Sequence, residues 1–214
     1  MLNVKISSLQ LTERDVQILV FINEFGFCTL QHLETQFCFK KPRSSQIMRR
    51  LVNAGLVVYD RIFYERPGVY HLTQKGARYT GLPPLKRIPL GNYIHEITLL
   101  DVYLKLKIDY PDALWISERR LKQDKFFESV KKGGHISDGM LVFQGGLRVA
   151  IEVELTLKSR ERLEQIFKNY GTQFEINEVW YYCAESIMAP LRKGAMNMPW
   201  IQIFSLKEFL ETGG

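Results

Sequence analysis

The chain has 214 residues, of which 46% are hydrophobic, and a formal net charge of +6. This length allows one large domain or two small ones with buried cores. No apolar run approaches the roughly 20 residues of a membrane helix, and the first residues lack the pattern of a signal peptide. Three cysteines without CxxC spacing indicate neither a disulfide framework nor a zinc site, so we expect a cytoplasmic protein without a membrane partner.

The basic excess belongs to the first part of the chain. Residues 1–90 contain 13 Lys and Arg against 6 Asp and Glu, a net charge of +7. The remaining residues contain 16 Lys and Arg against 17 Asp and Glu, a net charge of −1. Such an asymmetry favours contact with a polyanion, made mainly by the N-terminal part.

Three helices followed by two strands are predicted in the first 81 residues. The apolar spacing predicts helices at residues 13–25, at 29–37, and from 43 or 44 to 54. Thr12 is a typical N-cap of the first helix, and Gly26 ends it. The third helix is expected to turn Ile47, Leu51 and Val52 inward. Strands at residues 56–59 and 69–72 then enclose a basic turn.

This order, with "MRRLVNAGLV" followed by "YHLTQKGARY", resembles the winged helix family over residues 10–81. In that family the third helix enters the major groove of DNA, and the wing contacts the backbone or minor groove. The resemblance therefore implies that DNA is bound by residues on or before the third helix and in the wing. These are Lys40, Lys41, Arg43, Ser44, Ser45, Gln46, Arg49, Arg50, Arg61 and Arg66.

Within that set, Lys and Arg would contact phosphates, and Ser45, Gln46 and Arg49 are candidates for contact with base edges. No acidic residue occurs between Lys40 and Tyr59. The alternative is a solvated basic helix in a winged helix domain that binds another protein.

A proline-rich segment, residues 82–92, is the expected linker, because proline disfavours helix in the residue before it. The second domain, residues 93–214, is expected to follow the order α-β-β-β-α-β-(α)-β, which implies one mixed sheet with packed helices. Its helices are predicted at 93–107, 160–170 and 206–210, with a helix or loop near 186–193. Its strands are predicted at 114–117, 139–143, 147–155, 178–183 and 200–204. The charged segment 119–134 is expected to be a solvated loop.

The stretch "AIEVELTLKS" carries two carboxylates on one face of a strand, Glu152 and Glu154. Like charges repel, so this face of the strand is either exposed to solvent or contacts a positively charged group. A hairpin turn at residues 144–146 would bring Asp138 back beside Glu152, and Lys158 follows the strand end. Two or three carboxylates suit Mg²⁺ or Mn²⁺, so we predict a metal site at Asp138, Glu152 and Glu154, with Lys158 assisting catalysis. The alternative is an edge strand with a solvent-facing acid pair neutralised by the lysine.

This arrangement resembles the PD-(D/E)xK nuclease superfamily, the restriction-endonuclease-like fold, whose core is αβββαβ. The element "SDG" stands where the family has its first acid, so Asp138 aligns with it. In "EVE", Glu152 matches the D/E position, but Glu154 occupies the position of the lysine. Lys158 resembles a displaced replacement. This departure leaves open whether the protein cuts DNA.

A winged helix before such a core, with "YIHE" opening the second half, resembles the replication-relaxation family and the MobC-class relaxases of mobile elements. The resemblance implies nicking at an origin of transfer or replication, with His95 and Glu96 near the site. His95 could also be an ordinary structural histidine. Two other functions stay open, an inactive DNA-binding accessory factor and a transcription regulator. Replication or conjugation proteins are the expected partners, and a homodimer would suit a palindromic site.

Overall fold

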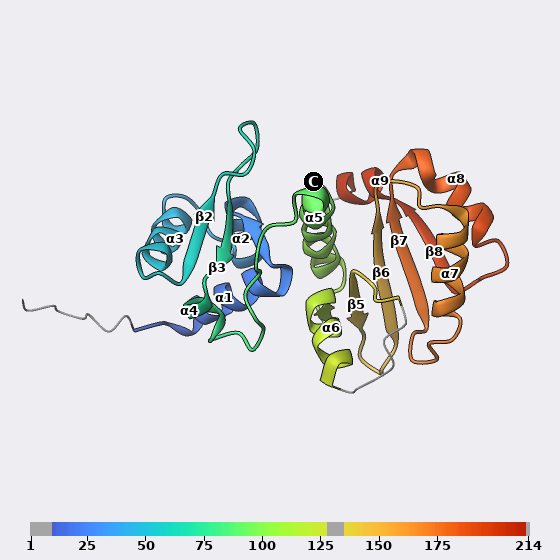
Figure 1. Cartoon of the computed structure of the whole chain (residues 1–214), viewed down its shortest axis with the longest axis horizontal. Coiled ribbons are helices and arrows are strands. Elements are labelled where there is room, and N and C mark those ends of the chain that lie inside the picture. Colours follow the sequence, from blue (N-terminus) through green and yellow to red (C-terminus); the bar gives the residue numbers. More distant parts are fainter. Residues whose placement is uncertain (1–9, 128–134, 213–214) are drawn as a thin grey trace, which may run out of the picture. The chain divides into compact units, whose positions relative to one another are not determined.

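The computed structural model describes residues 10–127 and 135–212 and divides into two compact units, residues 1–88 and 89–214. The boundary after Ile88 falls inside the segment 82–92 that was expected to be a linker. Each unit has its own sheet (Figure 1). In the part of the chain that is described, no helix is long and apolar enough to cross a membrane.

The first unit contains four helices and three strands among its described residues. These are α1 (Glu13–Phe25), β1 (Phe27–Thr29), α2 (Leu30–Phe37), α3 (Arg43–Asn53), β2 (Val57–Asp60), β3 (Val69–Leu72) and α4 (Gln74–Ala77). A capping box between Thr12 and Asp15 begins α1, and Gly26, with a φ of 82°, ends it. The first three helices and β3 lie close to the predicted positions.

The first strand was not predicted. Its three residues pair antiparallel with β3, which also pairs antiparallel with β2, so the sheet order is β1-β3-β2. A three-residue strand between two helices is too short to show the alternation on which prediction depends. Its pairing instead depends on β3, whose partner residues lie 40 to 44 positions further along the chain.

The buried face of α3 differs from the predicted one. Ser44, Met48 and Leu51 are buried, whereas Ile47 and Val52 are half-buried. The buried positions follow a spacing of four and three residues, which is one stripe of a helix. The prediction was therefore right for Leu51 and partly right for Ile47 and Val52, and it missed Ser44 and Met48.

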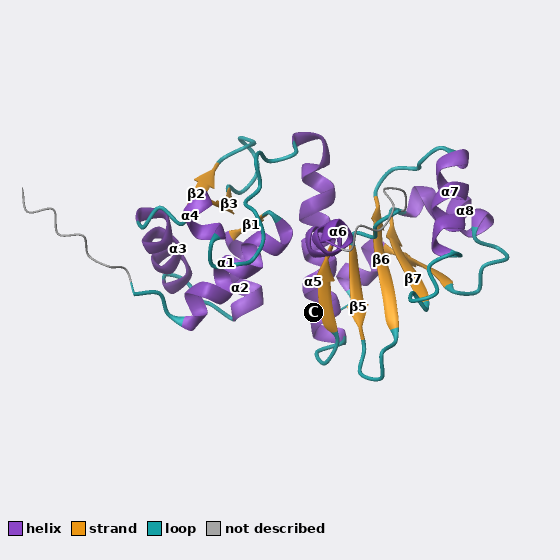
Figure 2. Ribbon diagram, turned by 60° about the horizontal axis from the view of Figure 1, so that its bottom comes forward, coloured by secondary structure: helices purple, strands orange, loops and turns teal. Residues whose placement is uncertain are grey.

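The second unit begins with a 3-10 helix, Leu90–Asn92, and contains ten further described helices and strands. These are α5 (Tyr93–Asp109), β4 (Leu114–Ser117), α6 (Glu118–Phe127), β5 (Gly139–Val142), β6 (Arg148–Glu154), α7 (Arg160–Tyr170), β7 (Glu178–Cys183), α8 (Glu185–Gly194), β8 (Ile201–Ser205) and α9 (Leu206–Glu211). The sheet order is β4-β5-β6-β7-β8. Figure 2 shows β5, β6 and β7 side by side in this sheet. The first two pairings are antiparallel and the last two are parallel, so the predicted mixed sheet is confirmed.

Helices cover both faces of this sheet. On one face, α7 and α8 pack over residues such as Ala150 and Tyr181. On the other face, α5 packs over Ile151 and Val153, and α9 adds half-buried side chains. The central strand β6 is therefore covered on both sides, and its residues from Val149 to Glu154 are all buried.

The charged segment that was expected to be a loop is helical where it is described. Residues Glu118–Phe127 form α6, and the rest of the segment, 128–134, lies outside the described residues. The Ser117 hydroxyl oxygen accepts the Arg120 N–H at 3.2 Å, and Lys122 pairs with Glu118 one turn earlier at 2.5 Å. A short helix of mostly polar residues has little apolar periodicity, which is why the sequence pattern did not indicate it.

Candidate functional site

The hairpin of β5 and β6 brings Asp138 to the strand that carries the two glutamates. Gly139 faces Ile151 in the antiparallel register, so Asp138 lies opposite Glu152. The Val153 N–H donates to Asp138 Oδ2 at 2.8 Å, which fixes the carboxylate against β6. The predicted neighbourhood of Asp138 and Glu152 therefore forms.

His95 of α5 reaches the same carboxylate. Its Nε2 lies 3.2 Å from Asp138 Oδ2 and 3.1 Å from the Val153 carbonyl oxygen, so the Nε2–H can donate to both. Burial lowers the pKa of His95, but the hydrogen bond and charge of Asp138, with the charge of Glu96, outweigh it and raise the pKa to about 9. His95 is therefore the positive charge beside Asp138 at neutral pH.

Glu96 completes the α5 side of the cluster. Its Oε1 lies 3.9 Å from His95 Nδ1. Burial raises the pKa of Glu96 to about 7, with the charges of Glu118 and Asp138 adding to the effect and His95 opposing it. The cluster therefore contains two groups that titrate near neutral pH or above it.

Glu152 is buried and accepts two hydrogen bonds on one oxygen. His135 Nε2 lies 2.6 Å from Glu152 Oε1, and the Tyr170 hydroxyl of α7 donates to the same atom. Burial raises the pKa of Glu152, and the charge of Asp138 raises it further, while His135 and Tyr170 act in the opposite direction.

Glu154 lies further along the same face of β6 and forms an ion pair with Lys158. Burial lowers the pKa of Lys158, although the charges of Glu152 and Asp138 oppose that effect. The exposed fractions of Glu152 and Glu154 are only 3% and 5%, and β6 is the middle strand of five. The alternative of a solvent-facing acid pair on an edge strand is therefore wrong.

These side chains do not fit the predicted divalent-cation site as they are arranged. Within residues 10–127 and 135–212, no three His, Cys, Asp or Glu side chains are grouped so that they could hold a metal ion. Each acid instead has a partner within the protein: His95 for Asp138, His135 and Tyr170 for Glu152, and Lys158 for Glu154. The cluster neutralises its acids with protein cations and hydroxyl donors.

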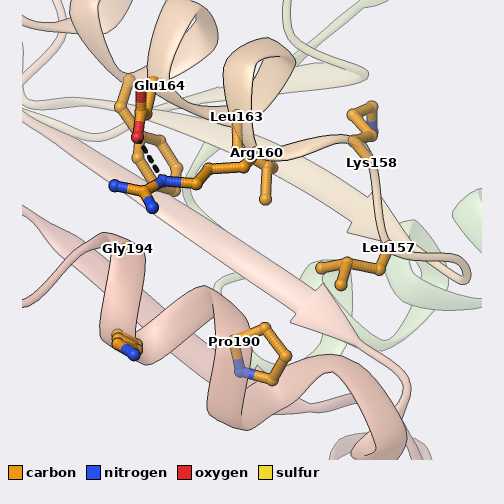
Figure 3. Close-up of a pocket in the computed structure, with 9 residues that line it drawn as sticks. Leu157, Lys158, Arg160, Leu163, Glu164, Pro190 and Gly194 are labelled. Carbon is orange, nitrogen blue, oxygen red and sulfur yellow. Dashed lines mark hydrogen bonds and ion pairs between the residues drawn. The ribbon is translucent and has the colours of Figure 1, made fainter.

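A hollow of about 390 Å³ opens beside Lys158, between α7 and α8 (Figure 3). Its apolar lining includes Leu157, Phe167 and Pro190. Arg160 at its rim pairs with Glu164 through a 2.8 Å hydrogen bond. Lys158 therefore borders both this hollow and the acid cluster.

The basic residues predicted to bind DNA lie mostly on the surface of the first unit. Lys40, Lys41, Arg43, Gln46 and Arg49 are exposed. A hollow of about 530 Å³ at the turn between α2 and α3 is lined by three of them and by Arg14, which sequence reasoning missed. The Arg14 guanidinium lies 5.8 Å from the Phe39 ring centroid, which holds it toward this turn.

Two residues of the predicted set on α3 have structural partners. Arg50 forms an ion pair with the buried Asp15 of α1. The Ser44 hydroxyl is buried and donates to Glu34 Oε1 at 2.6 Å. Ser45 is half-buried. The exposed set on α3 is therefore narrower than the sequence indicated. In the loop between β2 and β3, Arg61 and Arg66 are both exposed.

Comparison with known proteins does not place the chain in a family. No family model and no curated protein matches it. A solved structure described as "PigF with SAH" is similar at 13% identity and a TM-score of 0.21, over 92% of this chain. The chain spans 62% of the length of that protein. This TM-score is too low to indicate a shared fold or ligand.

Sequence reasoning missed His135 and Tyr170 as partners of the acid cluster. His135 lies in the segment "GGHISDG", three residues before Asp138. Tyr170 continues the apolar stripe of α7 formed by Leu163 and Phe167. Because this stripe is the face of α7 that packs on the sheet, the Tyr170 side chain also lies toward the sheet. A buried tyrosine normally finds a hydrogen-bond acceptor, and this could have indicated the contact with Glu152.

Proposed function

We propose that the chain is a DNA-binding protein whose N-terminal unit is a winged helix domain. The order α1-β1-α2-α3-β2-β3 and the sheet order β1-β3-β2 support this assignment. In such domains the third helix occupies the major groove and the loop between the last two strands contacts the duplex beside it. Here those elements are α3 and the loop between β2 and β3.

One observation carries the proposal: the turn before α3 and its outer face expose five polar or basic side chains without an acid among them. These are Lys40, Lys41, Arg43, Gln46 and Arg49. Cations placed along a helix release counterions from DNA when they contact phosphates, and this supplies much of the binding free energy. Gln46 and Arg49 have the donors and acceptors that recognise base edges in the major groove.

Replacing Arg49 with Ala tests this proposal. We expect the full-length variant to bind duplex DNA more weakly and to reduce the slope of log affinity against log salt by about one. Fluorescence anisotropy at several salt concentrations measures both quantities. Arg192→Ala, which removes an exposed arginine from α8 in the second unit, is the matched control. Equal effects of the two substitutions would contradict the proposed interface.

A second candidate function is cleavage of DNA by the second unit, as the resemblance to PD-(D/E)xK nucleases implies. It is favoured by the order α5-β4-β5-β6-α7-β7, interrupted only by α6, and by the position of Asp138 opposite Glu152. Lys158 and His95 would then stabilise negative charge on a phosphate near the acids. An accessory role in replication or transfer of a mobile element, with proteins of that machinery as partners, needs only the binding function.

Incubation with supercoiled plasmid and Mn²⁺ separates the two functions. A nuclease converts the plasmid to the nicked form, and Asp138→Asn should abolish this conversion while keeping a hydrogen-bonding group beside Val153. If the wild type and Asp138→Asn both leave the plasmid intact under conditions where they bind DNA, the nuclease function is contradicted and the accessory function is supported.

A further inference from the structure

The loop between β2 and β3 ends in an exposed aromatic side chain. The Arg66 N–H donates to the Phe63 carbonyl oxygen at 3.3 Å, which closes a turn with Tyr64 and Glu65 at its centre. The Tyr64 side chain is 88% exposed, and Phe63 beside it is also exposed. A large ring displayed at the tip of a loop is not held there by burial in the fold, so its faces are available to a binding partner.

Arg61 holds this tip in place. Its Nη2 donates to the Tyr64 carbonyl oxygen at 2.9 Å, and its guanidinium lies 5.4 Å from the centroid of the Tyr64 ring. The same side chain therefore fixes the backbone of the turn and supports the ring. A pre-formed aromatic surface loses little conformational entropy when it binds a flat partner.

We propose that Tyr64 stacks on an unpaired base, so that the wing binds DNA preferentially where the duplex is open. This inference rests on the proposed DNA-binding function of the first unit. Proteins that bind single strands combine cations that contact the backbone with aromatic rings on which bases stack. The wing has both, because Arg61 and Arg66 flank Tyr64 in the loop, against the single acid Glu65.

The geometry favours an open duplex over a closed one. In a closed duplex each base is stacked on both faces, so a protein ring meets only groove edges and phosphates unless it unstacks a step, which costs a few kcal/mol. At an unpaired position the bases are already partly unstacked, so the protein does not have to supply this free energy. The alternative is that the exposed Tyr64 binds another protein. The experiment below distinguishes this alternative from base stacking, because a Tyr64 that binds only a protein would give no preference for open over closed DNA.

The test compares two fluorescent probes with the full-length protein: a short duplex, and the same sequence with a central bubble of mismatched bases. We expect the wild type to bind the bubble more tightly. Tyr64→Ala should weaken binding to the bubble about tenfold, because an unpaired base loses its stacking ring, and should change binding to the duplex much less. Tyr64→Trp, which keeps a stacking ring, should retain the preference.

Phe174→Ala is the matched control, because Phe174 is a 94% exposed aromatic side chain of the second unit. It should change neither affinity. A 2-aminopurine in the bubble reports stacking directly, and its fluorescence should fall with the wild type and not with Tyr64→Ala. If the protein binds the duplex through Arg49 but shows no preference for the bubble, the stacking inference is wrong and the DNA-binding proposal stands. Absence of binding to both probes overturns the DNA-binding proposal as well.

Discussion

His95 links α5 to the central strand of the second unit through its charge. Its pKa of about 9 in the folded protein exceeds the value of about 6.5 expected in the unfolded chain. A raised pKa means that the folded protein holds the proton more tightly. The stabilisation by this histidine is therefore fully present below about pH 6.5 and is lost as the pH rises through about 9.

We expect His95→Gln to reduce the free energy of unfolding by on the order of 2 kcal/mol at a pH near 6 and by much less above a pH of about 10. Denaturant unfolding at a series of pH values measures this difference. Asp138→Asn should flatten the same pH dependence, because Asp138 is the main group that raises the pKa of His95. A variant profile parallel to that of the wild type over this range would show that the pair does not carry the effect.

Neighbouring arginines of α3 are expected to have different roles. Arg50 pairs with Asp15, which is buried at the start of α1. Burial raises the pKa of Asp15, but hydrogen bonds from Arg50 and Thr12 outweigh it and lower the pKa. Arg50→Ala leaves a buried carboxylate without its cation, so we expect a loss of about 1–3 kcal/mol in the free energy of unfolding.

The exposed Arg49 serves as the comparison for Arg50. Arg49→Ala should change the free energy of unfolding by less than about 0.5 kcal/mol, as is usual for surface substitutions. Thermal or denaturant unfolding of both variants, measured beside DNA binding, decides the assignment. Equal stability of the two variants, together with weaker DNA binding by Arg50→Ala, would place Arg50 in the DNA interface instead of the fold.

The pairing of β4 with β5 depends on a glycine. Gly139 faces Ser117 in the register, and a Cβ at Gly139 would overlap the indole ring of Trp115. Gly139→Ala should therefore cost about 1–3 kcal/mol, as overpacking of a core does. Gly91→Ala, where a Cβ meets nothing within 4 Å, is the control and should be close to neutral. Comparable unfolding midpoints for the two variants would mean that Trp115 moves aside without cost.

The division of the molecule into two units predicts independent folding. The first unit buries its own apolar residues, such as Ile18, Leu19 and Leu51, and the second has clusters on both faces of its sheet. We expect fragments 1–88 and 89–214 each to unfold cooperatively, and the first to retain the affinity for duplex DNA. Circular dichroism and anisotropy measure these properties. A fragment 1–88 without a cooperative transition would show that its core needs the second unit.

The sequence by itself determined the local structure of this protein. Apolar periodicity and capping residues such as Thr12 located most helices, because capping and the helical stripe depend on residues within a few positions of each other. The order of elements predicted one mixed sheet, and the hairpin before Val149 predicted that Asp138 meets Glu152. The sequence did not indicate β1 or α6, which have no apolar repeat of their own.

Only the tertiary structure decided what neutralises the acids. His135 and Tyr170 reach Glu152 from 17 and 18 residues away, and His95 reaches Asp138 from 43 residues away. The burial of Glu152 likewise depends on the helices that cover both faces of β6. The pKa of an acid depends on the groups that lie within a few ångströms of it in space. The alternation of side chains along one strand carries no information about which groups these are.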